Sequence, residues 1–568
     1  MKKLLLILFV LVFISLKAQE NYPKNDFRSP LDIPLYLSGT FGEPRTTHFH
    51  GGLDLKTEGV EGKNVYAIGD GFVSRIKVSG YGYGNAIYIT HTNGYTSVCG
   101  HLSKFNDEIA AWVKTQQESL TSFELDLEHL DPSLFPVKKG DIVAKSGNTG
   151  GSQGPHVHFE IRDSLENTIN PFLFGFDIKV QDNIKPSLFN LVAYNLSGDR
   201  QFSNSKTIKI SGSGGNYTVA ETLKLNKDAV GFGINTTDKA NDVSNNNGIY
   251  DIKMYLDGEL MYNYQINKFS FDEGRYVYSQ CDYWLKVNNY QNVHKCFVEP
   301  GNKLDSYKYL NNNGYIFLYD FEVHSVKIEV SDFHKNTSTL NYKIQRDDSS
   351  AFFQESSPSF QEVLVQGKVN WFKNDDIALK LPENALFDDV YFKITKEART
   401  GVSDGFQVGD VKTPIFGSFN IDVKAKQLNE ALKDKYLLVY KNYRNILKAV
   451  GGILNDETQT IEGKTKGFGY YYISIDTIPP VISSLSVSSG KTMTNYKAIQ
   501  FKITDNLSGI ETYDLFINGK WAVLEVDGKN ALYTYYIDEK VVKGNNQLTL
   551  VVKDERNNAR TYSVEFVY

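Results

Sequence analysis

The amino-acid sequence predicts a mostly β protein built from several domains. Its 568 residues correspond to about three to four domains of ordinary size. Tyrosine and phenylalanine are abundant, at 36 and 35 residues, whereas methionine occurs only 4 times. Short alternating apolar stretches end in Asx-Gly turns, of which Asn93-Gly94 is the clearest. This combination of aromatic-rich stretches and tight turns favours β domains over helical bundles.

An internal repeat occupies the C-terminal two thirds of the chain. Residues 182–191 match residues 476–485, and residues 330–336 match residues 552–558. Between these landmarks, both copies carry a Gly-Ile pair followed at the same spacing by an Asx-Gly turn. Landmarks in the same order indicate one module that is used twice.

The repeat sets the expected order of domains after residue 180. Short alternating strands predict an immunoglobulin-like β-sandwich in each copy, at 184–346 and at 480–568. The first copy is longer because it carries an insertion. Residues 347–478 are expected to form a separate β-rich domain. The sequence therefore predicts two or three β-sandwich domains behind an N-terminal domain.

The first 18 residues have the pattern of a signal peptide. Lys2 and Lys3 form the positively charged n-region, residues 4–16 form the apolar h-region, and Ala18 ends a small-residue cleavage site. The apolar run is short for a membrane span, so an uncleaved anchor is the weaker alternative. We expect an exported protein, in the periplasm, the cell envelope or outside the cell, with no transmembrane segment once the signal is removed.

The charge balance excludes one class of partner. The chain has 61 basic and 67 acidic residues, a formal net charge of −6. Such a chain has no basic field to attract nucleic acid or an anionic membrane surface. We therefore expect no nucleic-acid partner.

Three cysteines are an odd number for an exported protein. Cys281 and Cys296 are close in sequence, and we expect them to form a disulfide. Cys99 has two interpretations, a buried apolar thiol or a nucleophile paired with His101. Two residues at i and i+2 on a strand are poorly placed for a thiolate–imidazole hydrogen bond, so the buried thiol is preferred.

Histidines concentrate near the N-terminus, where seven of the 10 lie within the first 158 residues. His50 and Asp54 are an imidazole and a carboxylate four residues apart, and His156 and His158 share one face of a strand. A catalytic Zn²⁺ site uses three such ligands and leaves one position open. His50, Asp54 and one histidine of the pair supply three ligands. The other histidine and His101 then remain to move protons.

Three separated pieces carry a family resemblance. Residues 50–54 read His-Gly-Gly-Leu-Asp, His101 is followed by leucine, and residues 147–160 read Gly-Asn-Thr-Gly-Gly-Ser-Gln-Gly-Pro-His-Val-His-Phe-Glu. The pieces resemble, in type and order, the motifs of the lysostaphin-type zinc endopeptidases, which cut peptidoglycan cross-bridges. The resemblance covers residues 39–174 and implies a zinc peptidase domain at 30–180.

The resemblance also implies a role for each site residue. His50, Asp54 and His158 correspond to the metal ligands, and His101 and His156 to the catalytic pair. Glu160 continues the face of the paired histidines, and its two interpretations are a partner that holds an imidazole and a plain surface glutamate.

The chain departs from the family pattern in the long segment at 103–136. Within it, Asn106 can cap a short helix whose apolar stripe contains Ile109, Trp112 and Val113. This helix either packs on the domain or forms a lid beside the cleft.

We therefore expect an exported zinc metalloendopeptidase that hydrolyses peptide bonds in peptidoglycan cross-links. The peptidoglycan substrate is implied by the resemblance alone. The alternative is a non-catalytic envelope binding or regulatory protein on the same fold. In a third hypothesis, the C-terminal β domains hold an envelope protein or glycan partner.

Overall fold

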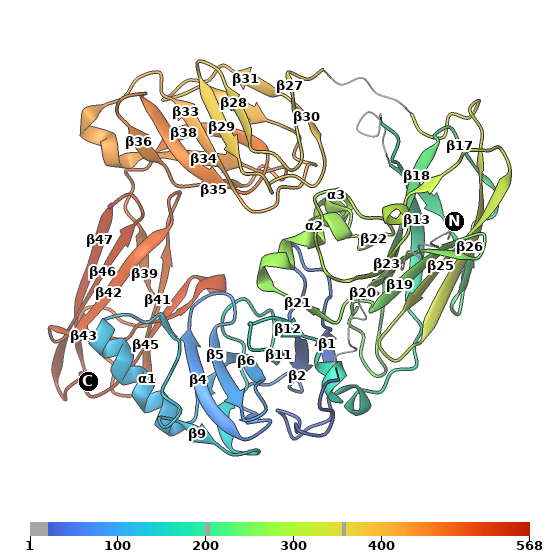
Figure 1. Ribbon diagram of the computed structural model, residues 1–568. Coiled ribbons are helices and arrows are strands. Elements are labelled where there is room, and N and C mark those ends of the chain that lie inside the picture. The colour runs from blue at the N-terminus through green and yellow to red at the C-terminus, as the bar shows by residue number, and fades with distance from the viewer. Residues whose placement is uncertain (1–20, 199–204, 355–358) are drawn as a thin grey trace, which may run out of the picture.

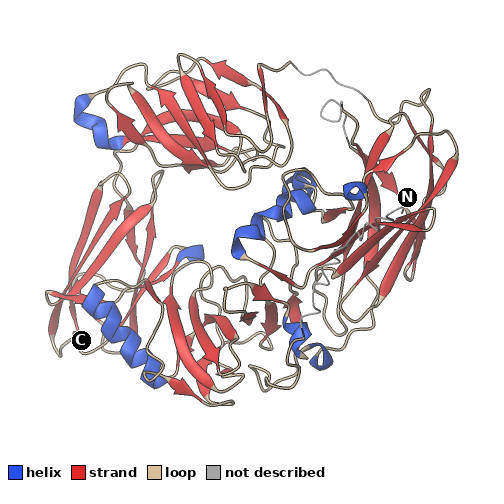
Figure 2. Ribbon diagram, viewed as in Figure 1, coloured by secondary structure: helices blue, strands red, loops and turns tan. Residues whose placement is uncertain are grey.

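The computed structural model describes residues 21–198, 205–354 and 359–568. The expected signal peptide, at 1–18, lies outside the described residues. Strands predominate in every part of the chain and helices are few (Figure 2). The predicted fold class, mostly β with an N-terminal β-rich domain followed by further β domains, is confirmed. Four β-rich parts follow one another around a ring (Figure 1).

The N-terminal part is built on one large antiparallel sheet. Its central order is β1-β2-β11-β6-β5-β4-β8. The strands are β1 (Leu37–Gly39), β2 (Leu53–Lys56), β4 (Gly71–Val78), β5 (Asn85–His91), β6 (Thr96–Leu102), β8 (Leu125–Leu127) and β11 (His156–Arg162). Short strands β9 (Pro136–Val137) and β12 (Thr168–Ile169) join the edges, and a small second sheet contains β3 (Asn64–Tyr66), β7 (Lys104–Phe105) and β10 (Ile142–Lys145). The hairpin predicted at Asn93-Gly94 joins β5 to β6.

The expected helix in the long segment is confirmed as α1 (Asp107–Leu120). The Asn106 side chain accepts a hydrogen bond from the backbone N–H of Ile109, and two acidic residues lie in the first turn, where the helix dipole favours them. Ile109 and Val113 are buried, and Trp112 meets Phe135 edge to face. The helix thus packs on the domain, and it does not line the site described below.

The second part, from 187 to 346, contains two sheets. One has the order β14-β13-β18-β22, with β24 beside β18, and the other has the order β15-β16-β26-β25-β19-β20-β23, with β17 beside β26. The first sheet consists of β13 (Ser187–Asn195), β14 (Lys206–Lys209), β18 (Ala229–Thr237), β22 (Val293–Lys295) and β24 (Ile316–Phe317). The second consists of β15 (Ser211–Ser213), β16 (Asn216–Thr218), β17 (Leu223–Leu225), β19 (Asp251–Leu256), β20 (Glu259–Gln265), β23 (Tyr307–Leu310), β25 (Val323–Ser331) and β26 (Thr337–Arg346).

The expected insertion in this part contains α2 (Val277–Gln280) and α3 (Tyr283–Asn289). Just before them, β21 (Lys268–Phe269) pairs with β12, so the large N-terminal sheet continues into the second part.

The third part has two five-stranded sheets and a core of its own. Its strands are β27 (Glu362–Leu364), β28 (Asn370–Lys373), β29 (Ile377–Leu381), β30 (Val390–Phe392), β31 (Ile394–Glu397), β32 (Gly405–Val408), β33 (Phe419–Lys424), β34 (Tyr436–Lys441), β35 (Leu447–Ala449), β36 (Ile453–Asn455), β37 (Thr460–Thr465) and β38 (Gly469–Ile475). The sheets run β28-β29-β33-β37-β36 and β31-β32-β38-β34-β35, and β27 pairs with β30.

The last part also has two sheets, β39-β41-β45-β44 and β40-β47-β46-β42-β43. They contain β39 (Val481–Ser484), β40 (Lys491–Thr492), β41 (Ala498–Thr504), β42 (Ile510–Ile517), β43 (Lys520–Ala522), β44 (Glu525–Asp527), β45 (Leu532–Tyr536), β46 (Asn545–Asp554) and β47 (Ala559–Val567). This part returns to the N-terminal domain and closes the ring beside α1 (Figure 1). Lys114 of the helix pairs with Asp538 at 2.9 Å, and Lys540 pairs with Glu118.

The expected disulfide is wrong, because Cys99, Cys281 and Cys296 are all buried free thiols. The β-bridge beside the insertion places His294, not Cys296, opposite Cys281, so the two sulfur atoms are out of register. The Cys99 interpretation as a buried thiol is confirmed. Burial raises the pKa of Cys99 to about 12, which keeps the thiol protonated and inert.

Among the described residues, no helix combines the length and the apolar character that crossing a bilayer would require.

Candidate metal centre

The centre forms where β2 and β11 run side by side. Their register places Asp54 directly opposite His158. Gly52 lets the loop before β2 run against β11, because a Cβ atom at this position would lie 2.2 Å from the carbonyl oxygen of Phe159. Gly39 on β1 leaves room for the carboxylate, since its Cβ would lie 2.6 Å from Asp54 Oδ2. Small residues at these two positions are therefore required by close packing around the site.

Three donor atoms converge at this point. His50 Nε2 lies 2.9 Å from Asp54 Oδ1, His158 Nδ1 lies 2.9 Å from the same oxygen, and the two nitrogens are 3.0 Å apart. All three residues are buried. Ligands held about 2.0–2.1 Å from a tetrahedral ion are separated by roughly 3.3 Å. The donor set therefore fits a small divalent metal ion.

Each imidazole of the cluster has one nitrogen held by an acceptor outside it. The partners are the carbonyl oxygens of Thr40 for His50 Nδ1 (2.7 Å), Thr149 for His101 Nδ1 (2.8 Å) and Gly154 for His156 Nδ1 (2.8 Å), and the Glu160 carboxylate for His158 Nε2 (2.7 Å). An oxygen that only accepts requires the hydrogen to be on that nitrogen. The opposite nitrogen is then the one that faces the centre and can bind a metal ion, which is the arrangement that metal-binding histidines adopt.

His101 and His156 lie together beside the three donors. Their ring centroids are 4.7 Å apart, and His156 Nε2 is 3.5 Å from Asp54 Oδ1. His101 adopts a left-handed backbone conformation with φ of 60°, and its N–H donates to the carbonyl of Tyr83 at 2.7 Å. The structure thus brings all five residues singled out by the sequence into one cluster.

Glu160 lies behind His158 and is completely buried. Its carboxylate accepts hydrogen bonds from His158 Nε2, from Tyr83 Oη at 2.6 Å and from Arg162 Nε at 2.8 Å. Burial would raise the pKa of Glu160, but the charges of Arg162 and His158 lower it to about 2. Of the two interpretations of Glu160, the one as a partner of an imidazole is correct.

Arg45 holds the other side of Asp54. Its Nη2 donates to Asp54 Oδ2 at 2.8 Å, which leaves Oδ1 to face the histidines. Burial would raise the pKa of Asp54, but His50, His156 and His158 keep it well below its usual value. Sequence reasoning did not identify Arg45, Tyr83 or Arg162. Only Arg162 had a signal, since it follows Glu160 at i+2 on the same strand face.

Three other histidines of this domain were expected to lie outside the centre. His48 is exposed on the rim of the groove, and His129 is exposed in the long segment, both as expected. The interpretation of His91 as a solvated turn residue is wrong. His91 is buried, and its Nε2 bonds to Ser97 Oγ at 2.8 Å, because the β5–β6 hairpin packs beneath the N-terminal segment that contains Phe27.

The cluster lines a groove with a cavity volume of about 1220 Å³. One wall comes from the loop at 151–155 before β11. Another comes from the second part of the chain, through Asp242, Val243 and Asn245 between β18 and β19, and through Phe271. The groove is thus shared between the N-terminal domain and the β-rich part that follows it.

Fold and site together define a metallopeptidase domain. Residues 48–118 match the family model described as Peptidase family M23. The N-terminal domain therefore belongs to peptidase family M23, the lysostaphin-type metallopeptidases. Residues 361–476 match a second model, described as a Zu5-like domain.

Curated relatives match about a quarter of the chain. An uncharacterized metalloprotease of Haemophilus influenzae is 33% identical over 147 residues, which cover 25% of this chain and 26% of the relative. The peptidoglycan DD-endopeptidase ShyA of Vibrio cholerae is 31% identical over 141 residues, 24% of this chain and 26% of the relative. The DD-carboxypeptidase/endopeptidase Mpg of Neisseria meningitidis is 30% identical over 117 residues, 21% of each chain. The chain thus spans about a quarter of the length of these relatives.

Among solved structures, the catalytic domain of lysostaphin from Staphylococcus simulans is 26% identical, with 24% of this chain and 88% of that chain covered and a TM-score of 0.18. The catalytic domain of a prophage-encoded M23 protein from Enterococcus faecalis is 23% identical, with 27% and 98% covered and a TM-score of 0.20.

Metal binding at this centre is expected to release a proton. In the metal-free protein burial alone would lower the pKa of His158, but hydrogen bonds to Asp54 and Glu160 raise it to about 9. A metal ion competes with that proton for the imidazole. Apparent zinc affinity should therefore rise with pH, by about tenfold per unit below pH 9, and level off above it. Zinc titration against a competing chelator between pH 6 and pH 10 measures this slope.

Glu160→Gln provides the matched variant, because it removes the charge that raises the pKa of His158 but keeps an acceptor for its N–H. In this variant apparent zinc affinity should depend less steeply on pH, and it should fall by about tenfold or more. Glu166→Gln, at the exposed far side of Arg162, should keep the wild-type slope. A zinc affinity that does not change with pH in the wild-type protein would contradict the proton-linked site.

Proposed function

We propose that this protein is an exported zinc metalloendopeptidase that hydrolyses peptide bonds in peptidoglycan cross-links. The observation that carries the proposal is the convergence of His50 Nε2, Asp54 Oδ1 and His158 Nδ1 beside two further imidazoles in one groove. Two imidazoles and one carboxylate are a ligand set that suits Zn²⁺ and leaves a fourth position open. When bound there, zinc supplies a Lewis acid that activates water and polarises a peptide carbonyl.

His101 and His156 move protons in this proposal. Each is held through Nδ1 by a backbone carbonyl, so its Nε2 is an acceptor that faces the centre. One imidazole can take the proton of the attacking water, and the one that is protonated can pass a proton to the leaving amine. The two roles are available to either residue, because both nitrogens face the same space. Burial and the neighbouring histidines lower the pKa of His101 to about 3, which favours its neutral, accepting form in the resting protein.

The substrate proposal follows from the groove and from the relatives. A groove of about 1220 Å³ accommodates an extended peptide. The ShyA relative is a peptidoglycan DD-endopeptidase by name and is 31% identical to this chain over 141 residues. Peptidoglycan lies in the cell envelope, which agrees with the export signal predicted at 1–18. We further propose that the modules at 184–346 and 480–568 are immunoglobulin-like, which their two-sheet architecture supports.

The alternative is a binding protein without turnover. The intact set of five residues and the pre-oriented imidazoles favour the enzyme. The test is release of primary amines from purified peptidoglycan by zinc-loaded protein, by metal-stripped protein, and by stripped protein to which zinc has been returned. We expect the zinc-loaded protein to release amines, the metal-stripped protein to release none, and the protein to which zinc has been returned to release them again. Failure of the fully zinc-loaded protein to release amines would favour the binding protein.

A further inference from the structure

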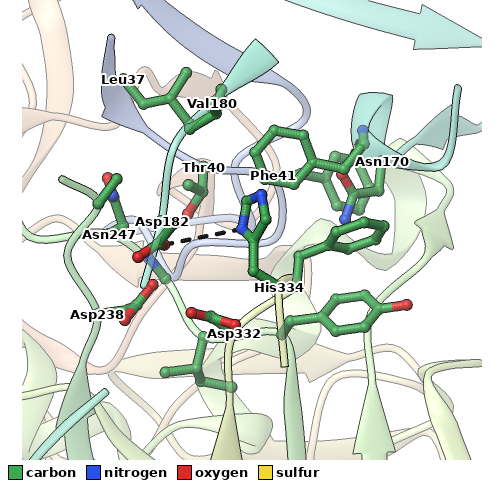
Figure 3. A pocket seen from close by; sticks show the side chains of 16 residues that line it. Leu37, Thr40, Phe41, Asn170, Val180, Asp182, Asp238, Asn247, Asp332 and His334 are labelled. Atoms are coloured by element: carbon green, nitrogen blue, oxygen red, sulfur yellow. Dashed lines mark hydrogen bonds and ion pairs between the residues drawn. The ribbon is translucent and has the colours of Figure 1, made fainter. Parts of the chain in front are cut away.

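A small cavity lies at the junction between the N-terminal domain and the first β-sandwich (Figure 3). Its volume is about 30 Å³, which is room for one ion or water molecule but not for an organic ligand. Leu37, Thr40 and Phe41 form one side and belong to the N-terminal domain. The polar side comes from three separate segments of the sandwich and from the linker that precedes it.

Three carboxylates converge on this cavity. Asp182 comes from the linker, Asp238 immediately follows β18, and Asp332 immediately follows β25. Donor atoms of Asp182, Asp332 and His334 lie within 4.8 Å of one another, and Asp238 reaches toward the same space in Figure 3. Burial and the charges of Asp182 and Asp332 raise the pKa of Asp238 to about 9 in the ion-free protein. Without an ion, the three carboxyl groups thus resist being charged at the same time.

Two oxygen atoms at the cavity have no hydrogen-bond partner. They are Asp238 Oδ1 and Asn247 Oδ1, and their residues expose only 3% and 2% of their surface. Buried polar atoms are almost always paired with protein or with a ligand. The nearby imidazole does not supply the missing donor to either atom, since His334 bonds through Nε2 to the carbonyl of Asp177 and pairs with Asp182 at 4.0 Å.

The second copy of the module carries three aspartates at the corresponding places. Asp476 precedes the sandwich, Asp505 follows β41, and Asp554 ends β46. Their donor atoms lie within 4.8 Å of one another, and Asp505 Oδ1 also lacks a partner. The carboxylate triad is therefore a repeated feature of this module rather than an accident of one loop.

We propose that the cavity binds a calcium ion through Asp182, Asp238, Asp332 and the side-chain carbonyl of Asn247. Carboxylate and amide oxygens are the ligands of hard cations, and Ca²⁺ takes several of them in flexible geometry. The ion balances the charge of the carboxylates that it binds and gives both unpartnered oxygens a partner.

The ion would fix one wall of the peptidase groove. Asp238 and Asn247 pair in a β-bridge that closes the loop between β18 and β19. That loop contributes Asp242 to the groove, and the N–H of Gly248 just after it donates to Thr40 Oγ1 at 2.9 Å. The carbonyl of Thr40 in turn holds His50. The calcium site therefore joins the sandwich to the domain that carries the metal centre.

The test is calorimetric titration of Ca²⁺ into the zinc-loaded full-length protein, dialysed free of calcium. Asp238→Asn keeps the shape of the side chain and removes its charge, and Asp348→Asn, at an exposed aspartate paired with Arg346, is the control. We expect wild type and the control to bind calcium. Asp238→Asn should lose one binding event or bind it at least about tenfold more weakly, because calcium affinity follows the number of charged ligands.

Thermal unfolding separates a lost site from a lost fold. Without calcium, Asp238→Asn should melt close to the wild-type temperature, because the amide replaces a carboxyl group of the same shape that burial and its acidic neighbours keep uncharged. Calcium should then raise the melting temperature of wild type and Asp348→Asn by several degrees more than that of Asp238→Asn. Absence of calcium binding by wild type would overturn the proposal. Equal number and affinity of calcium ions in wild type and Asp238→Asn would overturn it as well.

Discussion

Replacing His101 or His156 with alanine is expected to lower the rate of peptidoglycan cross-link hydrolysis by about 10²–10⁴-fold. Both residues present Nε2 to the centre, and neither is needed to complete the set of three donors. Each variant should therefore fold and retain zinc while losing proton transfer. The measurement is amine release from purified peptidoglycan at equal zinc content.

His48→Ala is the matched control, since His48 lines the same groove but is exposed at its rim. Its rate should stay within a few-fold of wild type, because the substitution leaves all the proposed ligands and proton carriers in place. Equal rates in wild type, His101→Ala and His156→Ala would remove these two histidines from the mechanism.

Replacing His50 or Asp54 with alanine is expected to remove most of the bound zinc and nearly all of the activity. Each substitution leaves two donors where a catalytic site needs three. Asp54→Ala also leaves Arg45 without the carboxylate oxygen that it contacts at 2.8 Å. Metal analysis of the purified proteins measures the loss, and His48→Ala should keep about one zinc per chain. Full zinc occupancy in both His50→Ala and Asp54→Ala would refute the proposed ligand set.

The centre could be predicted from the sequence because local spacing determines much of it. His156 and His158 alternate on one strand, and the two glycines after His50 allow the close approach to β11 that the structure shows. The residues around the centre could not be predicted in the same way. Arg45 and Tyr83 reach it from loops whose positions depend on the packing of the whole sheet, and no local pattern marks them.

Register was the second limit on prediction. Cys281 and Cys296 are close in sequence, but which residue faces Cys281 depends on how the insertion pairs across its bridge, and His294 occupies that place. The burial of His91 likewise depends on a distant N-terminal segment that packs over the hairpin. Hydrophobic pattern and turn chemistry determine that a hairpin forms, but they do not determine what covers it.

The internal repeat could be recognised in the sequence, but the carboxylate cluster that each copy carries could not. Asp182 and Asp332 served there only as landmarks of the module. They are 150 positions apart, and only the sandwich topology brings both of them to Asp238. The ion pair between Lys114 and Asp538, which closes the ring, likewise joins residues that are far apart in sequence and that no local pattern connects.

Mass analysis of purified peptidoglycan after digestion by the zinc-loaded protein tests the central proposal most directly. Cross-linked muropeptides should be converted into uncross-linked ones with a gain in mass of one water per cleaved bond, and each cut should expose a new amino group. The metal-stripped protein and His156→Ala should leave the cross-linked species intact over the same time. Cross-linked muropeptides that persist unchanged with the zinc-loaded wild-type protein would contradict the assignment of this chain as a peptidoglycan endopeptidase.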